Sequence, residues 1–261
     1  MTTPDPRPGV KMSVARQFSN AAANYSHSPI HAAGADLQEM IVAAGLRGDE
    51  RLLDAGCGPG HTALHFAPHV GQIVALDLSE SMLEQGRRLA VDREIANVEF
   101  RQGDVEHLPF SDAEFDLVTT RYSAHHWPHP ADALTEFCRV LRPSGRLLLA
   151  DAITFDDYTV DTHVQAIELL RDASHVRDHT AEQWLSLLRR AGFAAEVVFT
   201  WTIHIDFASW VARIHTPPQQ VAMLRTILVN APDEVKTALR IQPDGSFTMQ
   251  CALFRATPQR E

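Results

Sequence analysis

The sequence predicts an α/β fold in which helices cover both faces of a mostly parallel sheet. Two observations predict it. Between residues 51 and 150, short apolar runs alternate with amphipathic helical patterns, which is the order that right-handed β-α-β crossovers need. A buried strand pattern also ends in the glycine-rich turn Gly56-Cys-Gly-Pro-Gly60. Because open parallel sheets bind ligands at the carboxyl ends of their strands, we expect the binding site at this edge.

The elements follow one another in a regular order as far as residue 150. We expect strands at residues 51–55, 72–77, 98–102, 115–120, 146–150, 195–205 and 246–256. The predicted helices span residues 14–23, 29–44, 79–91, 131–141 and 181–191, with further helical sequence over residues 206–240. A turn at 143–145 separates the fourth of these helices from the strand that follows it.

Two segments, 155–178 and 206–242, interrupt the sheet pattern. We expect them to be helical insertions that cover the carboxyl edge, although plain packing or dimer contacts remain open. The whole chain, residues 1–261, then forms a single domain. Its parts are an N-terminal cap at about 14–30, a ligand-binding core at about 31–153, and the two insertions.

Composition excludes several classes of protein. Of the 261 residues 45% are apolar, and 23 basic against 33 acidic residues give a net charge of −10. This is enough apolar material for a packed core, and the acidic balance disfavours nucleic acid and anionic membranes as partners. Three scattered cysteines without a CxxC pair argue against disulfides and a zinc site, and no segment reads as a signal peptide or membrane helix. We expect a cytoplasmic protein without a bound metal and without membrane insertion.

The glycine-rich turn is the strongest local signal. Gly56 and Gly58 lack side chains, so the backbone can bend sharply and a ligand can approach it closely. A dinucleotide fingerprint needs G-x-G-x-x-G, but His61 stands where its last glycine belongs. No G-K-[ST] follows, which excludes a P-loop.

Two acidic residues follow the next strands in register with this turn. Asp77 ends the second strand, where a carboxylate accepts hydrogen bonds from ribose hydroxyls. Asp104 follows the third strand, where it can accept from an adenine amino group. A single aspartate after a strand is often only a helix cap, but two behind a glycine-rich turn favour a nucleoside site.

Together these features resemble the class I S-adenosylmethionine-dependent methyltransferases, and within them the methyltransferase type 11 group, related to ubiquinone/menaquinone-biosynthesis methyltransferases. The matching stretches are LLDAGCGPG (52–60), VALDLSESML (74–83), GDVEHLPF (103–110), FDLVTTRYSAHHW (115–127) and EFCRVLRPSGRLLLAD (136–151). The likeness fades outside residues 14–153, apart from the helix at 181–193. It implies a Rossmann-like, seven-stranded fold and binding of S-adenosylmethionine, with S-adenosylhomocysteine as product.

The resemblance also implies roles for individual residues. Asp54 and the backbone of Gly56 and Gly58 would hold the methionine part, with Cys57 lining the turn as a small spacer. Asp77 would bind the ribose, and Leu78 and Met82 would pack on adenine. The remaining contacts would come from Asp104 to the adenine amino group, the Val105 N–H to a ring nitrogen, the Arg121 backbone near the methionine ammonium, and Tyr25 as an aromatic cap near the sulfonium.

Catalytic help would come from the loop after the fourth strand. Type 11 proteins often carry a histidine where this chain has His126, and a pKa near neutrality suits a histidine to deprotonate a phenol or enol. His126 is the first candidate for this base and His125 the second. In a chain with 14 histidines, a role in loop packing stays open for both. Arg171, His175 and Arg177 either hold an acidic group of the substrate or face solvent.

These observations predict S-adenosylmethionine-dependent transfer of a methyl group to a small-molecule acceptor, at carbon or oxygen of a quinol, phenol or secondary metabolite. One alternative is a family member that binds the cofactor without methylating, as a scaffold for another reaction or as a sensor. A nicotinamide-dependent dehydrogenase is disfavoured by His61. We expect a monomer or homodimer.

Overall fold

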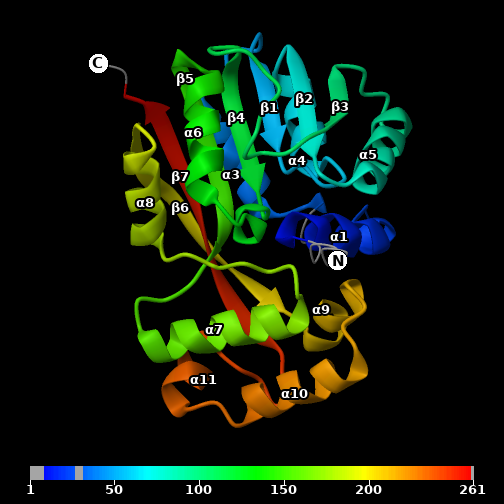
Figure 1. Ribbon diagram of the computed structural model, residues 1–261, viewed down its shortest axis with the longest axis vertical. Coiled ribbons are helices and arrows are strands. Elements are labelled where there is room, and N and C mark those ends of the chain that lie inside the picture. The colour runs from blue at the N-terminus through cyan, green and yellow to red at the C-terminus, as the bar shows by residue number, and fades with distance from the viewer. Residues whose placement is uncertain (1–8, 27–31, 260–261) are drawn as a thin grey trace, which may run out of the picture.

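A sheet of seven strands runs through the molecule in the computed structural model, which describes residues 9–26 and 32–259 (Figure 1). The strands are β1 (Arg51–Ala55), β2 (Gln72–Asp77), β3 (Val98–Gln102), β4 (Phe115–Arg121), β5 (Leu141–Ile153), β6 (Phe193–Ile205) and β7 (Phe247–Pro258). Their order across the sheet is β3-β2-β1-β4-β5-β7-β6. β7 runs antiparallel to β5 and β6, and the other neighbours are parallel. The predicted fold class is therefore confirmed.

Helices cover both faces of this sheet. They are α1 (Val10–Ser26), α3 (Ala35–Ala44), α4 (His61–Phe66), α5 (Glu80–Asp92), α6 (Pro130–Val140), α7 (Tyr158–Arg171), α8 (Ala181–Arg190), α9 (Phe207–Arg213), α10 (Pro218–Val229) and α11 (Asp233–Leu239). One face packs against α6 and α8, where Phe137 and Trp184 are buried. The other packs against α3 and α4 through Met40 and Phe66.

The alternation of strand side chains creates these two cores. On β1, Leu53 points into the core under α6 and α8, whereas its neighbour Leu52 points into the core under α3 and α4. Both leucines are fully buried. Successive side chains of a strand face opposite sides of the sheet, so a strand covered on both faces must be apolar throughout. This explains the continuous apolar runs in the sequence.

A third core lies beyond the carboxyl edge of the sheet. β6 and β7 are paired along their whole length, from Phe193 opposite Pro258 to Ile205 opposite Phe247. Their far ends extend past the other strands, and α7, α9, α10 and α11 gather around them (Figure 1). These helices bury Trp210, Leu224 and Val235 against the two strands. The molecule thus has a sheet half and a helical half, and the long antiparallel pair of β6 and β7 runs through both.

The structure differs from the predicted elements in three places. α1 begins at Val10, earlier than the expected helix at 14–23, and α3 begins at Ala35 because Gly34 precedes it in an extended conformation. The predicted residues 27–31 of the cap and of that second helix lie outside the described residues. The expected turn at 143–145 instead lies inside β5. The register between β4 and β5 shifts there, because Phe115 pairs with Leu141 but Leu117 pairs with Arg146.

The predicted insertions cover the edge only in part. α7 and α9 lie next to the carboxyl edge, but α10 and α11 pack against the far side of α7. Of residues 206–242, α9 thus lies next to the edge, whereas the apolar sides of α10 and α11 are buried against α7 and the β6–β7 pair. The role of the insertions as a lid stays a prediction.

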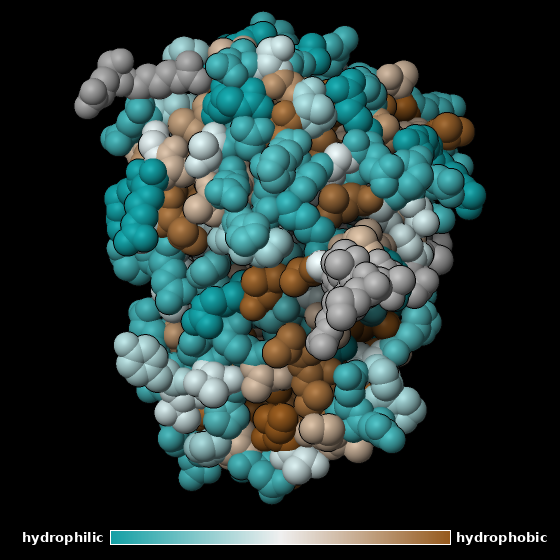
Figure 2. Space-filling model, viewed as in Figure 1, coloured by the Kyte–Doolittle hydropathy of each residue, from teal (hydrophilic) through white to brown (hydrophobic). Residues whose placement is uncertain are grey.

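The surface in this view is mostly hydrophilic, with hydrophobic residues gathered at the lower centre, where α7 and α10 lie (Figure 2). Exposed apolar side chains of these two helices include Leu169, Met223 and Val229. Among residues 9–26 and 32–259, no helix combines the length and apolar character that crossing a bilayer requires.

Candidate functional site

The glycine-rich turn lies between β1 and α4 and is held by the neighbouring strand. The N–H groups of Gly56 and Cys57 both donate to the Leu76 carbonyl oxygen, at 2.8 and 3.0 Å. Gly56 has φ 71° and Gly58 has φ 53°, a region that other residues rarely adopt. A Cβ on Gly56 would also collide with the Ser123 side chain. Glycine at position 56 is therefore required by both backbone conformation and space.

Asp77 stands at the end of β2 facing this turn. Its carboxylate accepts hydrogen bonds from the N–H groups of Gly58 and Ser79, each at 2.8 Å. Burial raises the pKa of Asp77, and these N–H groups oppose the rise. The carboxylate thus holds the turn in place and has lone pairs left for a ligand.

Asp104 follows β3 and is already paired. One of its oxygens accepts from the Glu106 N–H at 3.0 Å, and the other lies 2.5 Å from the ammonium nitrogen of Lys11. Burial alone would raise the pKa of Asp104, but its hydrogen bond to Lys11 brings that pKa below the ordinary value. Next to it, the Val105 N–H makes no hydrogen bond to the described residues, so it can donate to a ligand.

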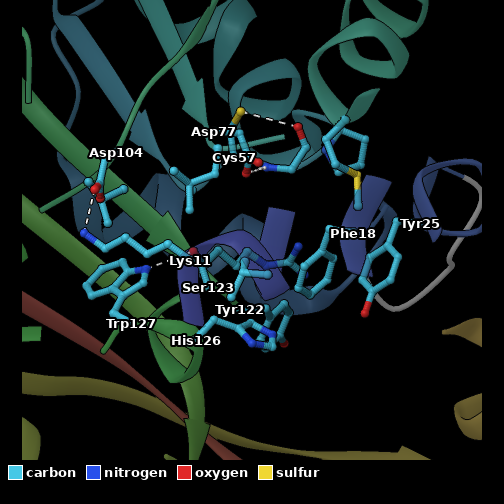
Figure 3. Close-up of a pocket in the computed structure, with 18 of the residues that line it drawn as sticks. Lys11, Phe18, Tyr25, Cys57, Asp77, Asp104, Tyr122, Ser123, His126 and Trp127 are labelled. Atoms are coloured by element: carbon cyan, nitrogen blue, oxygen red, sulfur yellow. Dashed lines mark hydrogen bonds and ion pairs between the residues drawn. The ribbon is translucent and has the colours of Figure 1, made fainter. Parts of the chain in front are cut away.

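A cavity of about 890 Å³, here called the first cavity, joins these groups (Figure 3). Many of the site residues predicted from the sequence line it, namely Tyr25, Gly56, Cys57, Gly58, Asp77, Leu78, Met82, Asp104, Val105, Arg121 and His126. The sequence therefore located this cavity, although the contacts that each residue makes with a ligand remain predictions.

Asp54 is an exception, because it does not line the first cavity. Its oxygens accept from the Thr119 hydroxyl and the Ala63 N–H, both at 3.0 Å. Burial raises the pKa of Asp54 to about 7. The structure thus places Asp54 behind the turn, where it holds the start of α4. Its predicted role at the methionine part stays a prediction.

Arg121 and Cys57 line the first cavity, and the environment of each side chain shows what it can do there. The Arg121 guanidinium is buried and pairs with Asp36 of α3, with its Nη2 3.1 Å from a carboxylate oxygen. Burial raises the pKa of Cys57 well above that of an ordinary thiol. Since the thiolate is the nucleophilic form, the structure supports a spacer role for Cys57.

Helix α1 closes the first cavity on the side opposite the glycine-rich turn. Phe18 and Tyr25 lie edge to face on this helix, with ring centres 5.3 Å apart, and Phe18 also meets the His126 ring edge to face at 4.8 Å. At the other end of the helix, Lys11 reaches Asp104 and Glu106, 2.5 Å from an oxygen of each (Figure 3). No sequence pattern pointed to Lys11, which lies before the predicted start of the helix at residue 14.

A second cavity of about 660 Å³ adjoins the first on the side of the helical half. The two share a wall made of Phe18, Tyr25, Tyr122 and His126. Beyond this wall, the second cavity is lined by Ala152, Ile203, Ile205, Trp210, Met249 and Cys251, and by the polar residues His125, Glu168, Arg171, Asp178 and Arg213. It has an apolar side and a charged side, as small-molecule sites commonly do.

His125 and Asp151 form a pair at the border of the second cavity. The His125 Nδ1 lies 2.7 Å from an Asp151 oxygen, and Asp151 is buried at the end of strand β5. The same carboxylate accepts from the N–H groups of Ala124, His125 and Ala152. Burial lowers the pKa of His125, but the charge and hydrogen bond of Asp151 outweigh it and raise the pKa to about 9.

His126 has the opposite electrostatic environment. Its Nδ1 lies 3.1 Å from the Ser174 carbonyl oxygen, so Nδ1 carries the proton and Nε2 has a lone pair. Burial, and then the neighbouring charge of His125, lower the pKa of His126 to about 4. The expectation that this pKa lies near neutrality is therefore wrong. His126 is neutral at physiological pH but takes up a proton poorly.

Several residues that shape the two cavities were missed from the sequence. Asp151 comes directly after the strand predicted at residues 146–150, as Asp104 comes shortly after the one at 98–102, so the same rule would have found it. Glu168 and Arg213 lie in the irregular second half, where no pattern indicated which side chains face a ligand. Of the three residues considered for an acidic substrate group, Arg171 lines the second cavity, whereas Arg177 pairs with Asp161 at 2.9 Å and His175 is buried beside Gln165.

The first cavity fits a nucleoside that carries an amino-acid tail. Asp77 offers acceptors for vicinal hydroxyls, the unpaired Val105 N–H offers a donor for a purine nitrogen, and the turn leaves backbone exposed at Gly58, where a Cβ would meet no atom within 4 Å. Within residues 9–26 and 32–259, no group of His, Cys, Asp and Glu side chains is arranged to hold a metal ion.

Comparisons with known proteins agree with this geometry. A family model described as a methyltransferase domain matches residues 53–149. The chain is 37% identical over 219 residues to an uncharacterized methyltransferase of Bacillus subtilis, YcgJ, which covers 84% of this chain and 87% of that protein. A crystal structure of YcgJ superposes with a TM-score of 0.83 over 86% of this chain and 98% of that one, at 34% identity.

A more distant relative is the ubiquinone/menaquinone biosynthesis C-methyltransferase UbiE of Pseudomonas putida, with 42% identity over 115 residues. This match covers 42% of the present chain and 45% of UbiE, so the two proteins are similar over less than half of either chain. The fold, the first cavity and these relatives lead to one conclusion: the chain belongs to the type 11 family of class I S-adenosylmethionine-dependent methyltransferases.

Proposed function

We propose that this enzyme methylates a small-molecule acceptor, at an oxygen or an acidic carbon, bound in the second cavity. Quinols and phenols are the acceptor classes that fit best. The observation that carries the proposal is the wall shared by the two cavities, made of Phe18, Tyr25, Tyr122 and His126. A donor in the first cavity and an acceptor in the second would meet there.

S-adenosylmethionine supplies a methyl group on a positively charged sulfur. A nucleophile attacks the methyl carbon in line, and the sulfur leaves as a neutral thioether. The chain's main contribution is then to hold the acceptor close and aligned, which is worth effective molarities of roughly 10⁵–10⁸ M. Phe18 and Tyr25 place aromatic rings at the shared wall, where they favour positive charge and exclude water. The apolar side of the second cavity suits a flat ring, with Trp210 and Ile203 among its residues.

An acceptor with an O–H group must also lose a proton. His125 is the better base of the two histidines, because Asp151 holds its ring and stabilises the protonated form. Within the described residues its Nε2 has no hydrogen-bond partner, so this atom can receive the proton as the new bond to the methyl carbon forms. His126 can accept a hydrogen bond from the acceptor at its Nε2 and so orient it.

A transfer assay with S-adenosylmethionine labelled on its methyl group tests this proposal. Quinols, phenols and amines are offered in turn, and the label is sought in each product. Label in a quinol or phenol supports the proposal. A product that forms without label, or tight cofactor binding with no labelled product from any class, contradicts it and favours a scaffold or a sensor.

A further inference from the structure

Two arginines and one glutamate line the second cavity without forming ion pairs. In the part of the chain that the structure describes, no carboxylate oxygen lies within 4.0 Å of the Arg171 or Arg213 guanidinium, and Glu168 has no cationic nitrogen within that distance. Enclosed charges are costly unless they are paired. Charged side chains that face a cavity unpaired therefore indicate a ligand that pairs with them.

Arg171 is the most constrained of the three. The residue is 8% exposed, its Nε donates to the Trp210 carbonyl oxygen at 3.2 Å, and its guanidinium lies 5.2 Å from the centre of the Trp210 ring. Its Nη2 is buried and has no hydrogen-bond partner among the described residues. The side chain is thus fixed in place beside the cavity with one donor unused.

Arg213 reaches the same cavity from α9. Burial lowers the pKa of Arg213, and the positive charge of Arg171 lowers it further, whereas Tyr25 and the negative charge of Glu168 oppose this change. Two guanidinium groups that repel each other across one cavity gain stability when an anion lies between them. Planar guanidinium groups also match the geometry of carboxylate and phosphate oxygens.

The carboxylates around the second cavity do not supply that anion. Asp151 is engaged by His125, and one Asp172 oxygen accepts from Ser174 at 2.6 and 2.8 Å. Burial raises the pKa of Glu168, and the positive charges of Arg171 and Arg213 oppose this rise. In the described residues, however, no oxygen of Glu168 lies within 4.0 Å of either guanidinium. Burial also raises the pKa of Asp178 well above the ordinary value.

We propose that Arg171 and Arg213 form a subsite for an oxyanion group of the methyl acceptor. This inference rests on the proposed function, since it places the acceptor in the second cavity. It narrows the acceptors to small molecules that carry a carboxylate or a phosphate remote from the methylated atom. The apolar side of the cavity and the shared wall would then hold the ring that joins the two groups.

Ligand binding to the complex with S-adenosylhomocysteine tests the subsite without a methylation assay. The probes are benzoate, its neutral isostere benzamide, and phenyl phosphate, with affinities measured by calorimetry. We expect benzoate, phenyl phosphate or both to bind at least about tenfold more tightly than benzamide, since a charged hydrogen bond is worth at least that factor. The ratio of the affinity for benzoate to the affinity for phenyl phosphate distinguishes a carboxylate subsite from a phosphate subsite.

The variants Arg171→Gln and Arg213→Gln should each reduce the anion affinity toward that of benzamide, while Arg171→Lys should retain part of it. Arg190→Gln, on the exposed side of α8, is the matched control and should bind like the wild type. Benzamide and S-adenosylhomocysteine affinities report whether each variant is folded.

Equal affinities for benzoate and benzamide in the wild type would overturn the inference, and so would anion binding that survives both glutamine substitutions. Labelled methyl transfer to neutral acceptors alone would also overturn it while leaving the proposed function intact. Charge-selective binding without any methyl transfer would support the subsite and contradict the proposed function.

Discussion

The Asp77 carboxylate provides the clearest test of the cofactor site at the level of one residue. The N–H groups of Gly58 and Ser79 donate to different oxygens of Asp77, so Asp77→Asn keeps an acceptor for one of them and loses the charged acceptor for the ribose. We expect S-adenosylhomocysteine to bind more weakly by about 1.5–3 kcal/mol, the value of a hydrogen bond to a charged group. Calorimetry measures this, with Asp156→Asn, an exposed residue before α7, as the control. An unchanged dissociation constant would disprove the ribose assignment.

The His125–Asp151 pair predicts how the rate depends on pH. The base must be unprotonated to act, and the pKa of His125 is raised to about 9, so kcat should rise with pH and level off above about 9. Asp151→Asn removes the negative charge that raises this pKa. The inflection should then move toward the ordinary value of about 6.5, and the maximal rate should fall.

Substitutions of the two histidines separate their roles. His125→Gln should lower kcat by about 10²–10⁴-fold and abolish the inflection, with cofactor affinity retained. His126→Gln should act mainly on KM, because the pKa of His126 is about 4 and its role is to orient the acceptor. Near-wild-type turnover in both variants would mean that proximity alone drives the transfer.

At the level of elements, the sequence predicted the sheet half well and the helical half poorly. The bounds of β1, β2 and β3 agree with the prediction. β1 and β2 are short, mostly apolar runs, and β3 alternates apolar and polar residues up to a glycine. No periodicity reveals that β6 and β7 pair with each other, since three helices separate the two strands in the sequence. The same reason hid Glu168 and Arg213, whose surroundings depend on tertiary packing.

The position of the helices predicts which of them respond to ligand. α1 carries Lys11, Phe18 and Tyr25 at the first cavity, and α9 carries Arg213 at the second. α10 and α11 line neither cavity. Hydrogen exchange with and without S-adenosylhomocysteine should therefore show added protection in α1 and the adjoining α9, but none in α10 and α11. Equal protection of α1 in both states would contradict the role of this helix as a cap.

Lys11→Met tests how α1 is held. The substitution removes the ion pairs of Lys11 with Asp104 and Glu106, which tie α1 to the turn after β3. Such a partly buried pair is worth about 1 kcal/mol, so α1 amides in the free enzyme should exchange roughly five times faster. Arg16→Met, an exposed change on the same helix, should leave these rates unaltered.

At the level of the whole molecule, three histidines lie where the sheet half meets the helical half. The His125 ring centre lies 4.3 Å from that of His126 and 5.8 Å from that of His175. Burial, followed by the charges of His125 and His126, lowers the pKa of His175 to about 2. In this packing, burial holds the pKa values of His126 and His175 below the ordinary value, whereas the negative charge of Asp151 holds that of His125 above it.

This cluster predicts that acid destabilises the fold through His175. In the unfolded chain His175 has a pKa of about 6.5, so below that pH the unfolded state binds a proton that the folded state excludes. Its contribution to the free energy of unfolding should fall by about 1.2 kcal/mol between pH 7 and pH 5.5. His175→Gln removes this term, so urea unfolding at both pH values should show a smaller loss in the variant than in the wild type by that amount. His204→Gln, a change at an exposed histidine of β6, should follow the wild type. If His175→Gln also follows the wild type, His175 accepts its proton within the folded protein, and the neutral state assigned to it here is wrong.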